Sequence, residues 1–194
     1  MNTISESSLL TLEAYAKQRN EIRSRVMAHK KNRTVHLGQH LTLIFEDDIT
    51  VRYQIQEMLR IEKTFDEQGI RNELNAYNPL VPDGTNLKAT MMLEYEDPEE
   101  RARELARLIG IERRVYVEVA ERERFYAIAD EDLLRESEEK TSSVHFLRFE
   151  LTSQAIAEFR ADRVVAIGVD HPYYRARIDR IGEGVQESLA KDFA

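Results

Sequence analysis

Cysteine is absent from the 194 residues of this chain. Its absence excludes disulfides, thiolate nucleophiles, cysteine-ligated zinc and iron–sulfur clusters from the chemistry of the chain itself. No apolar run approaches the ~20 residues that a membrane-spanning helix needs. The first 15 residues also lack the basic segment and the apolar segment of a secretory signal. We therefore expect a cytoplasmic protein that does not bind a membrane.

Basic residues are also fewer than acidic residues. The chain has 28 Lys and Arg residues against 36 Asp and Glu residues, a net charge of −8 and a pI near 5.3. An acidic surface repels phosphate backbones, so we do not expect nucleic acid as a partner. The most basic stretch, residues 19–33, is interpreted as a solvated helix face. Apolar residues make up 42% of the chain, which is enough for the core of one folded domain.

Hydrophobic periodicity divides the chain into helical and extended segments. Spacing of three and four residues predicts helices over residues 9–31, 47–67, 70–77, 98–109, 154–161 and 178–189. Alternation predicts about seven strands, mostly in hairpins, within residues 34–46, 87–95, 114–130, 144–151 and 163–169. This pattern favours a single domain of the α+β class over residues 1–194, with a mainly antiparallel sheet and helices from the N- and C-terminal parts packed on it. The highly charged residues 131–143 are expected to form an exposed, mobile connection.

The common catalytic and nucleotide-binding motifs are also absent. The sequence contains no GxGxxG, P-loop, HExxH, GxSxG or EF-hand pattern. Their absence lowers the odds of the commonest enzyme classes and leaves open whether any reaction is catalysed. No particular cofactor is indicated.

Two histidines, His36 and His40, flank the predicted turn of the first hairpin. Across a short turn, two imidazoles can approach closely enough to share a metal ion, with Glu46 or Asp47 as a further ligand. The alternative is a pair of exposed histidines beside a turn, which is the commoner arrangement. A metal site at His36 and His40 is therefore a hypothesis that needs a third convergent ligand.

Charged residues interrupt the apolar stripes of the first two predicted helices. Arg19 lies in the first stripe and Glu62 in the second. Because a buried charge needs a partner, we predict that the two helices pack together and pair these residues. Glu57 and Arg60 lie on a polar flank of the second helix, three residues apart, where they can form an ion pair.

Further polar residues fall on the strands. His145 and Arg148 lie on opposite faces of a strand that is apolar on both, and His171 follows the predicted central strand. Each histidine is most simply a buried side chain bonded to a backbone carbonyl. Alternatively, the polar residues line an internal ligand-binding site under the loop at residues 77–86. That candidate set is Arg19, Glu57, Arg60, His145, Arg148 and His171.

Several long strings are distinctive: FEDDITVRYQIQEMLRIE (45–62), ELNAYNPLVP (73–82), LKATMMLEY (87–95), SVHFLRFEL (143–151) and DHPYY (170–174). On these strings the chain resembles a bacterial family of functionally uncharacterised proteins of about this length, over nearly its whole extent. Members are commonly encoded beside rubrerythrin-like proteins and iron–sulfur oxidoreductases. The resemblance implies a role near peroxide defence or electron transfer. It brings no catalytic residues, and a cluster would have to belong to a partner.

Three hypotheses follow, in this order. The first is an accessory protein that binds a redox protein, and the second is an enzyme or sensor with a histidine/carboxylate metal site. The third is a small-molecule binding domain with an internal polar pocket. A homodimer is the default oligomer because two-fold dimers are the commonest, although no feature of the sequence requires one.

Overall fold

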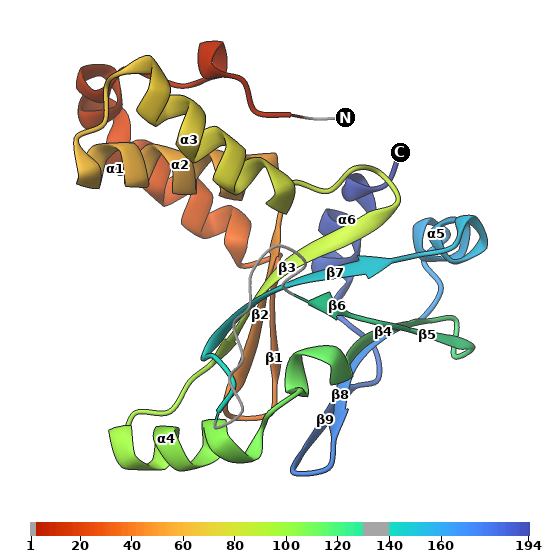
Figure 1. The fold of residues 1–194 in the computed structure, drawn as a ribbon. Helices are drawn as coiled ribbons and strands as arrows, with labels where there is room; N and C mark the ends of the chain where they lie inside the picture. Colours follow the sequence, from red (N-terminus) through yellow and green to blue (C-terminus); the bar gives the residue numbers. More distant parts are fainter. Residues whose placement is uncertain (1–2, 130–139) are drawn as a thin grey trace.

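The computed structural model describes residues 3–129 and 140–194. Within these ranges the strands form two antiparallel sheets (Figure 1). The larger sheet has the order β1 (Thr34–Leu37), β2 (Leu41–Glu46), β3 (Asn86–Leu93), β7 (Val144–Glu150) and β6 (Ile128–Ala129). The smaller sheet has the order β5 (Glu123–Tyr126), β4 (Val115–Val119), β8 (Val165–His171) and β9 (Tyr174–Ile178). The predicted α+β class is confirmed, with the strands divided between two sheets.

The helices fall into separate groups. Three of them gather at one end of the larger sheet: α1 (Leu12–Lys30), α2 (Asp48–Glu62) and α3 (Glu67–Tyr77) (Figure 1). They share a second, smaller apolar cluster built around Ile55, Leu59 and Leu74. The remaining helices are α4 (Pro98–Arg107), α5 (Ser153–Arg160) and α6 (Glu183–Leu189), with short 3₁₀ turns η1 (Glu6–Ser8), η2 (Asn78–Leu80), η3 (Ile111–Arg114) and η4 (Ala190–Asp192). In the described ranges, no helix combines the length and the apolar character needed to cross a membrane.

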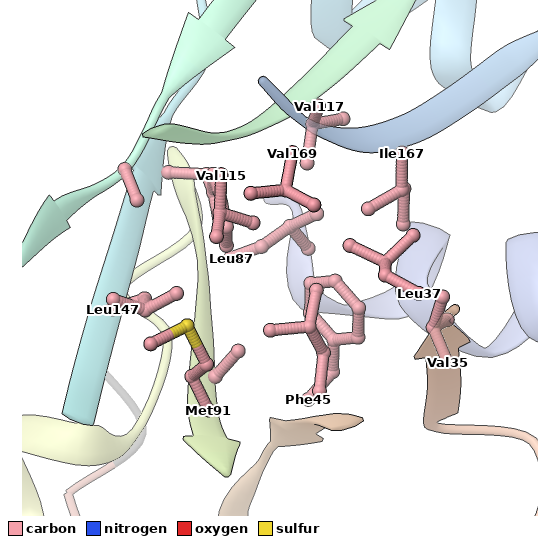
Figure 2. Close-up of a cluster of buried hydrophobic side chains, with 14 of the residues drawn as sticks. Val35, Leu37, Phe45, Leu87, Met91, Val115, Val117, Leu147, Ile167 and Val169 are labelled. Carbon is pink, nitrogen blue, oxygen red and sulfur yellow. The ribbon is translucent and has the colours of Figure 1, made fainter. Parts of the chain in front are cut away.

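The main core lies between the two sheets, because alternate residues of each sheet point toward the other (Figure 2). Phe45 and Met91 from the larger sheet and Val117 from the smaller sheet are fully buried there. The register pairs Phe45 with Ala89 and Ala89 with Leu147, so one face is apolar across three strands. The opposite face of the larger sheet therefore points away from this core.

Local hydrogen bonds set the ends of α2 and α3. Asp47 Oδ1 accepts from Thr50 N and Thr50 Oγ1 accepts from Asp47 N, each over 2.9 Å, which satisfies two backbone donors at the start of α2. The helix ends before Lys63, whose φ of 54° is left-handed, so the predicted continuation to residue 67 is wrong. Asp66 then accepts from Gly69 N and caps α3. Gly69 thus lies in the first turn of α3.

The largest difference from the prediction is at the C-terminal side, where residues 174–178 form strand β9. Its side chains alternate, with Ala176 and Ile178 packed against the core and Arg175 and Arg177 on the other face. The turn after β8 returns the chain antiparallel to that strand. The predicted final helix over residues 178–189 is therefore shortened to α6.

The predicted mobile connection at residues 131–143 lies largely outside the described residues. Its described end is held by backbone hydrogen bonds: Thr141 N donates to Leu105 O over 3.1 Å, and Leu93 N donates to Ser143 O over 2.8 Å. Thr141 is buried. Residues 141–143 are thus fixed against β3 and α4.

Gly168 in β8 lies directly under a tyrosine. A Cβ at this position would come within 2.4 Å of the Tyr116 hydroxyl. The Tyr116 ring lies 4.3 Å from the Arg124 guanidinium, and its hydroxyl accepts a hydrogen bond from Arg177 Nη1. Because the ring is held in place, Gly168→Ala is expected to lower the free energy of unfolding by about 1–3 kcal/mol in urea denaturation. Gly184→Ala, where a Cβ meets nothing closer than 3.5 Å, is the control, and equal losses in both variants would contradict this account.

Candidate functional site

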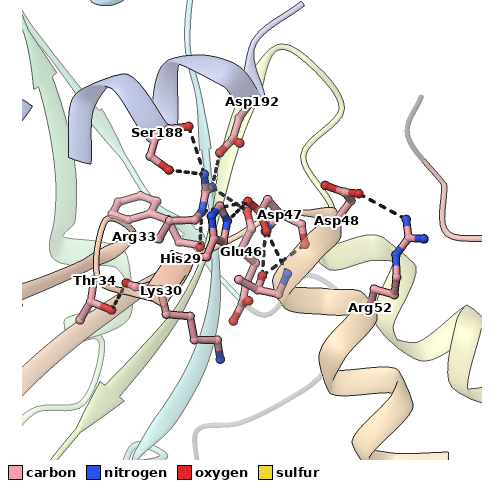
Figure 3. Close-up of polar contacts among 12 residues, drawn as sticks. His29, Lys30, Arg33, Thr34, Glu46, Asp47, Asp48, Arg52, Ser188 and Asp192 are labelled. Atoms are coloured by element: carbon pink, nitrogen blue, oxygen red, sulfur yellow. Dashed lines mark hydrogen bonds and ion pairs between the residues drawn. The ribbon is translucent and has the colours of Figure 1, made fainter. Parts of the chain in front are cut away.

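Arg33 is buried to 1% exposure just after α1. Each of its guanidinium nitrogens donates a hydrogen bond: Nε to Phe45 O over 2.8 Å, Nη1 to Ser188 O over 3.2 Å, and Nη2 to Glu46 O over 3.0 Å. Nη2 also donates to Asp192 Oδ2 over 2.5 Å. The guanidinium therefore connects β2 to α6 and η4, as Figure 3 shows.

Two carboxylates supply negative charge to this arginine cluster. Asp192 is one, and Asp47 is the other, with Oδ2 at 3.4 Å from Arg33 Nε and at 2.5 Å from His29 Nε2. Burial raises the pKa of Asp192 to about 6, while the Arg33 charge opposes that rise. Since Asp47 also caps α2, the cluster holds the first turn of α2 against the end of α1.

The interpretation of residues 19–33 as a solvated helix face is wrong for Arg33. Its acceptors at residues 45, 46, 188 and 192 come from distant parts of the chain. No local pattern marks a residue whose partners are brought to it only by the fold. The same holds for His29, whose partner Asp47 lies 18 residues further along the chain.

A pocket of about 290 Å³ lies beside the arginine cluster, between the larger sheet and the helices. Its floor is the face of the sheet that points away from the main core, with Ile44, Met92, Val144 and Phe146. Leu80 of η2 also lines the pocket. The volume is near the lower end of the range of about 300–1,000 Å³ that ligand pockets have, so the pocket suits a small metabolite.

Two half-buried residues of opposite charge line this pocket, Lys30 from the end of α1 and Glu46 from the end of β2. Glu46 Oε1 accepts a hydrogen bond from Thr90 Oγ1 over 2.7 Å. Within residues 3–129 and 140–194, neither Lys30 nor Glu46 takes part in an ion pair. The pocket thus combines an apolar floor with a cation and an anion that form no ion pair with each other in the described residues, and Lys88 lies across from Glu46 in the register of β2 and β3.

The arginine cluster fixes the backbone at both charged residues. Lys30 O accepts from Arg33 N over 3.0 Å and from Thr34 Oγ1 over 2.8 Å, and Glu46 O accepts from Arg33 Nη2. Figure 3 shows the Lys30 side chain extending away from the arginine. The backbone is therefore held in place at both charged residues.

Three of the predicted site residues do meet, on the helices. Glu57 accepts from Arg19 Nε and Nη2, each over 2.8 Å, and from Arg60 Nη2 over 3.2 Å. The buried Tyr15 hydroxyl donates to Glu57 Oε1 over 2.6 Å. Arg19 holds the pKa of Glu57 at about 2, well below its ordinary value. Arg19 therefore pairs with Glu57, and the predicted pair with Glu62 is wrong because Glu62 is exposed near the end of α2.

The other predicted residues are placed separately. His145 is fully buried, with Nε2 at 2.8 Å from Thr141 Oγ1 and 3.0 Å from Ser142 O. Arg148 points to the opposite face of β7 and contacts Glu150. His171 Nε2 lies 3.2 Å from Ile109 O, and burial lowers its pKa. None of the six predicted ligand-binding residues lines the pocket.

His36 and His40 lie at the first hairpin, as predicted, with other partners. His36 Nδ1 is 3.0 Å from Thr42 Oγ1, and His40 Nδ1 is 2.9 Å from Glu94 O. The His40 ring stacks on Tyr95 at 4.2 Å. In the part of the chain that the structure describes, no three His, Cys, Asp or Glu residues are grouped to hold a metal ion. The metal site stays a prediction without a third ligand.

The alternation of residues along β3 and β7 could have predicted the apolar residues of the pocket. Val144 and Phe146 share the face of β7 that turns away from His145, and Met92 occupies the matching face of β3. Apolar residues on both faces of neighbouring strands predict that both faces are covered. The loop at residues 77–86, under which the sequence predicts a ligand site, contributes Tyr77 and Leu80 to the pocket.

Comparison with known proteins places the chain in a family. Residues 3–193 match a family model described as "Protein of unknown function (DUF3501)". A crystal structure titled as a novel protein of unknown function from Burkholderia pseudomallei K96243 has 56% sequence identity and a TM-score of 0.95, covering 99% of this chain and 100% of that one. A comparison with curated proteins gave no match. The chain belongs to the DUF3501 family.

Proposed function

We propose that the protein binds a small organic molecule in the pocket between the larger sheet and the helices. The observation that carries the proposal is the pair of half-buried, opposite charges, Lys30 and Glu46, above an apolar floor. A partly buried charge lowers the stability of the folded protein unless a partner of opposite charge or a hydrogen-bonding group interacts with it. A bound polar molecule would supply that partner, and the apolar floor would exclude water from the rest of it.

Ligand-dependent stabilisation tests this proposal. The probes are L-leucine, isocaproate, isoamylamine and indole, which represent a zwitterion, an anion, a cation and a neutral compound. A ligand present at about 100 times its Kd raises the free energy of unfolding by about 2.7 kcal/mol, which corresponds to about 5–10 °C in Tm for a chain of this size. We expect at least one of these probes to raise the Tm of the wild-type protein.

A pocket-filling variant locates the binding. Met92→Trp places a larger side chain on the floor of the pocket and is expected to abolish the Tm increase. Met27→Trp adds the same side chain to an exposed position on α1 and should leave the increase intact. The proposal is wrong if none of the probes stabilises the wild-type protein, or if Met92→Trp binds the probes as well as Met27→Trp does.

The redox partner, the cytoplasmic location and the homodimer stay predictions from the sequence. The first of them rests on the resemblance to proteins encoded beside rubrerythrin-like neighbours. The small-molecule hypothesis, placed third from the sequence, has the pocket in its favour.

A further inference from the structure

We infer that the ligand is a zwitterion with an apolar tail, of the class of the aliphatic α-amino acids. The inference rests on the proposed function and names the chemical class that the same pocket selects. It follows from the arrangement of charge, from the surface between the charges and from the size of the pocket.

The arrangement of charge comes first. Lys30 and Glu46 line one pocket, and among the described residues no ion pair joins them. A molecule with both a carboxylate and an ammonium group can place each group against the opposite wall charge. A ligand with one charge satisfies one wall residue and is repelled by the other, because like charges disfavour each other at short range.

The hydrogen-bonding capacity of Glu46 agrees with this arrangement. Oε1 accepts one hydrogen bond, from Thr90 Oγ1, and a carboxylate has about four lone-pair sites. Glu46 therefore has capacity for the donors of a ligand ammonium group. Gln54, also on the wall, offers a neutral donor and acceptor nearby.

The floor of the pocket accounts for the apolar tail. Ile44, Met92 and Val144 present aliphatic surface on three adjacent strands. Burial of a branched aliphatic group on such a surface is favourable by about 25 cal/mol per Å². The volume of about 290 Å³ excludes dinucleotides and long peptides.

Calorimetric titration with three matched probes tests the inference. L-Leucine carries both charges, isocaproate lacks the ammonium group, and isoamylamine lacks the carboxylate. A hydrogen-bonded charge pair changes affinity by about 10- to 100-fold. L-Leucine is therefore expected to bind the wild-type protein at least tenfold more tightly than either analogue.

Neutral variants of Lys30 and Glu46 test which charged group of the ligand each residue binds. Glu46→Gln should weaken L-leucine by about 10- to 100-fold and leave isocaproate unchanged or tighter. Lys30→Gln should weaken L-leucine similarly and leave isoamylamine unchanged or tighter. Lys31→Gln, at the exposed neighbouring lysine, is the matched control and should bind all three probes as the wild type does.

The outcomes separate this inference from the proposed function. If isocaproate, isoamylamine or indole binds as tightly as L-leucine and Met92→Trp abolishes that binding, the pocket binds ligands and the zwitterion class is wrong. If all probes fail with the wild-type protein, both the pocket proposal and this inference fall. Tighter binding of L-leucine that is insensitive to Glu46→Gln and Lys30→Gln also overturns the inference.

Discussion

Replacing Arg33 by methionine is expected to lower the free energy of unfolding by about 3–5 kcal/mol, because it breaks a buried ion-pair network from one side. The substitution leaves the Asp192 carboxylate buried without its cation and removes donors from the carbonyls of Phe45, Glu46 and Ser188. For a chain of this size the loss corresponds to about 6–20 °C in Tm, measured by thermal denaturation followed by circular dichroism.

Arg23→Met is the matched control for this experiment. Arg23 is exposed on α1, so its replacement should change stability by less than about 0.5 kcal/mol. The double variant Arg33→Met with Asp192→Asn should lose less than the two single losses added together, because the residues interact directly. Equal stability of the Arg33 and Arg23 variants would show that the arginine cluster does not hold the fold together.

Acid is expected to remove a contribution of about 3 kcal/mol that Glu57 makes to stability at neutral pH. Arg19, Tyr15 and Arg60 hydrogen-bond to the ionised Glu57 and keep its pKa at about 2, below the ordinary 4.5. The unfolded chain therefore binds more protons than the folded chain between these values. The contribution is complete above pH 4.5 and is lost as the pH falls toward 2.

Urea denaturation across this pH window measures the effect. Glu57→Gln should flatten the dependence of stability on pH between 4.5 and 2, relative to the wild-type protein. Glu67→Gln removes a carboxylate that is 78% exposed and pairs with Arg71 at the surface, and should leave the slope almost unchanged. Arg177 and Arg124 likewise hold the pKa of Glu118 at about 2. Both Glu57 and Glu118 therefore contribute to the pH dependence of the stability of the wild-type protein.

Features of the fold that depend on neighbours in the sequence could be predicted. The hairpin at residues 34–46 and the helix that starts at Pro98 with Asp97 as its cap are both observed. Their signals, a glycine at the turn and a capping residue followed by proline, act within a few residues. The α+β class followed from the same local patterns.

The strand β9 shows where competing periodicities mislead. Ile178 fits a helical spacing with later apolar residues, and it also fits the alternation of residues 174–178. The segment forms a strand because the turn after β8 brings it beside β8, where Ile178 pairs with Ile167. Tertiary pairing therefore overrides the helical pattern that the sequence favours at Ile178.

The candidate site depended on long-range placement and was predicted less well. Tyr77 and Leu80, from the loop at residues 77–86, line the pocket, and the ligand site under this loop stays a prediction. The charged residues that line the pocket, Lys30 and Glu46, lie 16 residues apart in sequence and come from different elements. The sequence places Arg19 in an apolar stripe and Glu57 on a polar flank, and in the structure these two residues join α1 and α2.

Methyl NMR of methionine-labelled protein tests the central claim, that the pocket binds an apolar zwitterion, most directly. The chain has five methionines, of which Met92 lies on the pocket floor and Met27 is exposed elsewhere. Titration with L-leucine is expected to shift the Met92 methyl signal in a saturable manner and to leave the Met27 signal in place. A Met92 signal that does not move at saturating L-leucine would contradict the account.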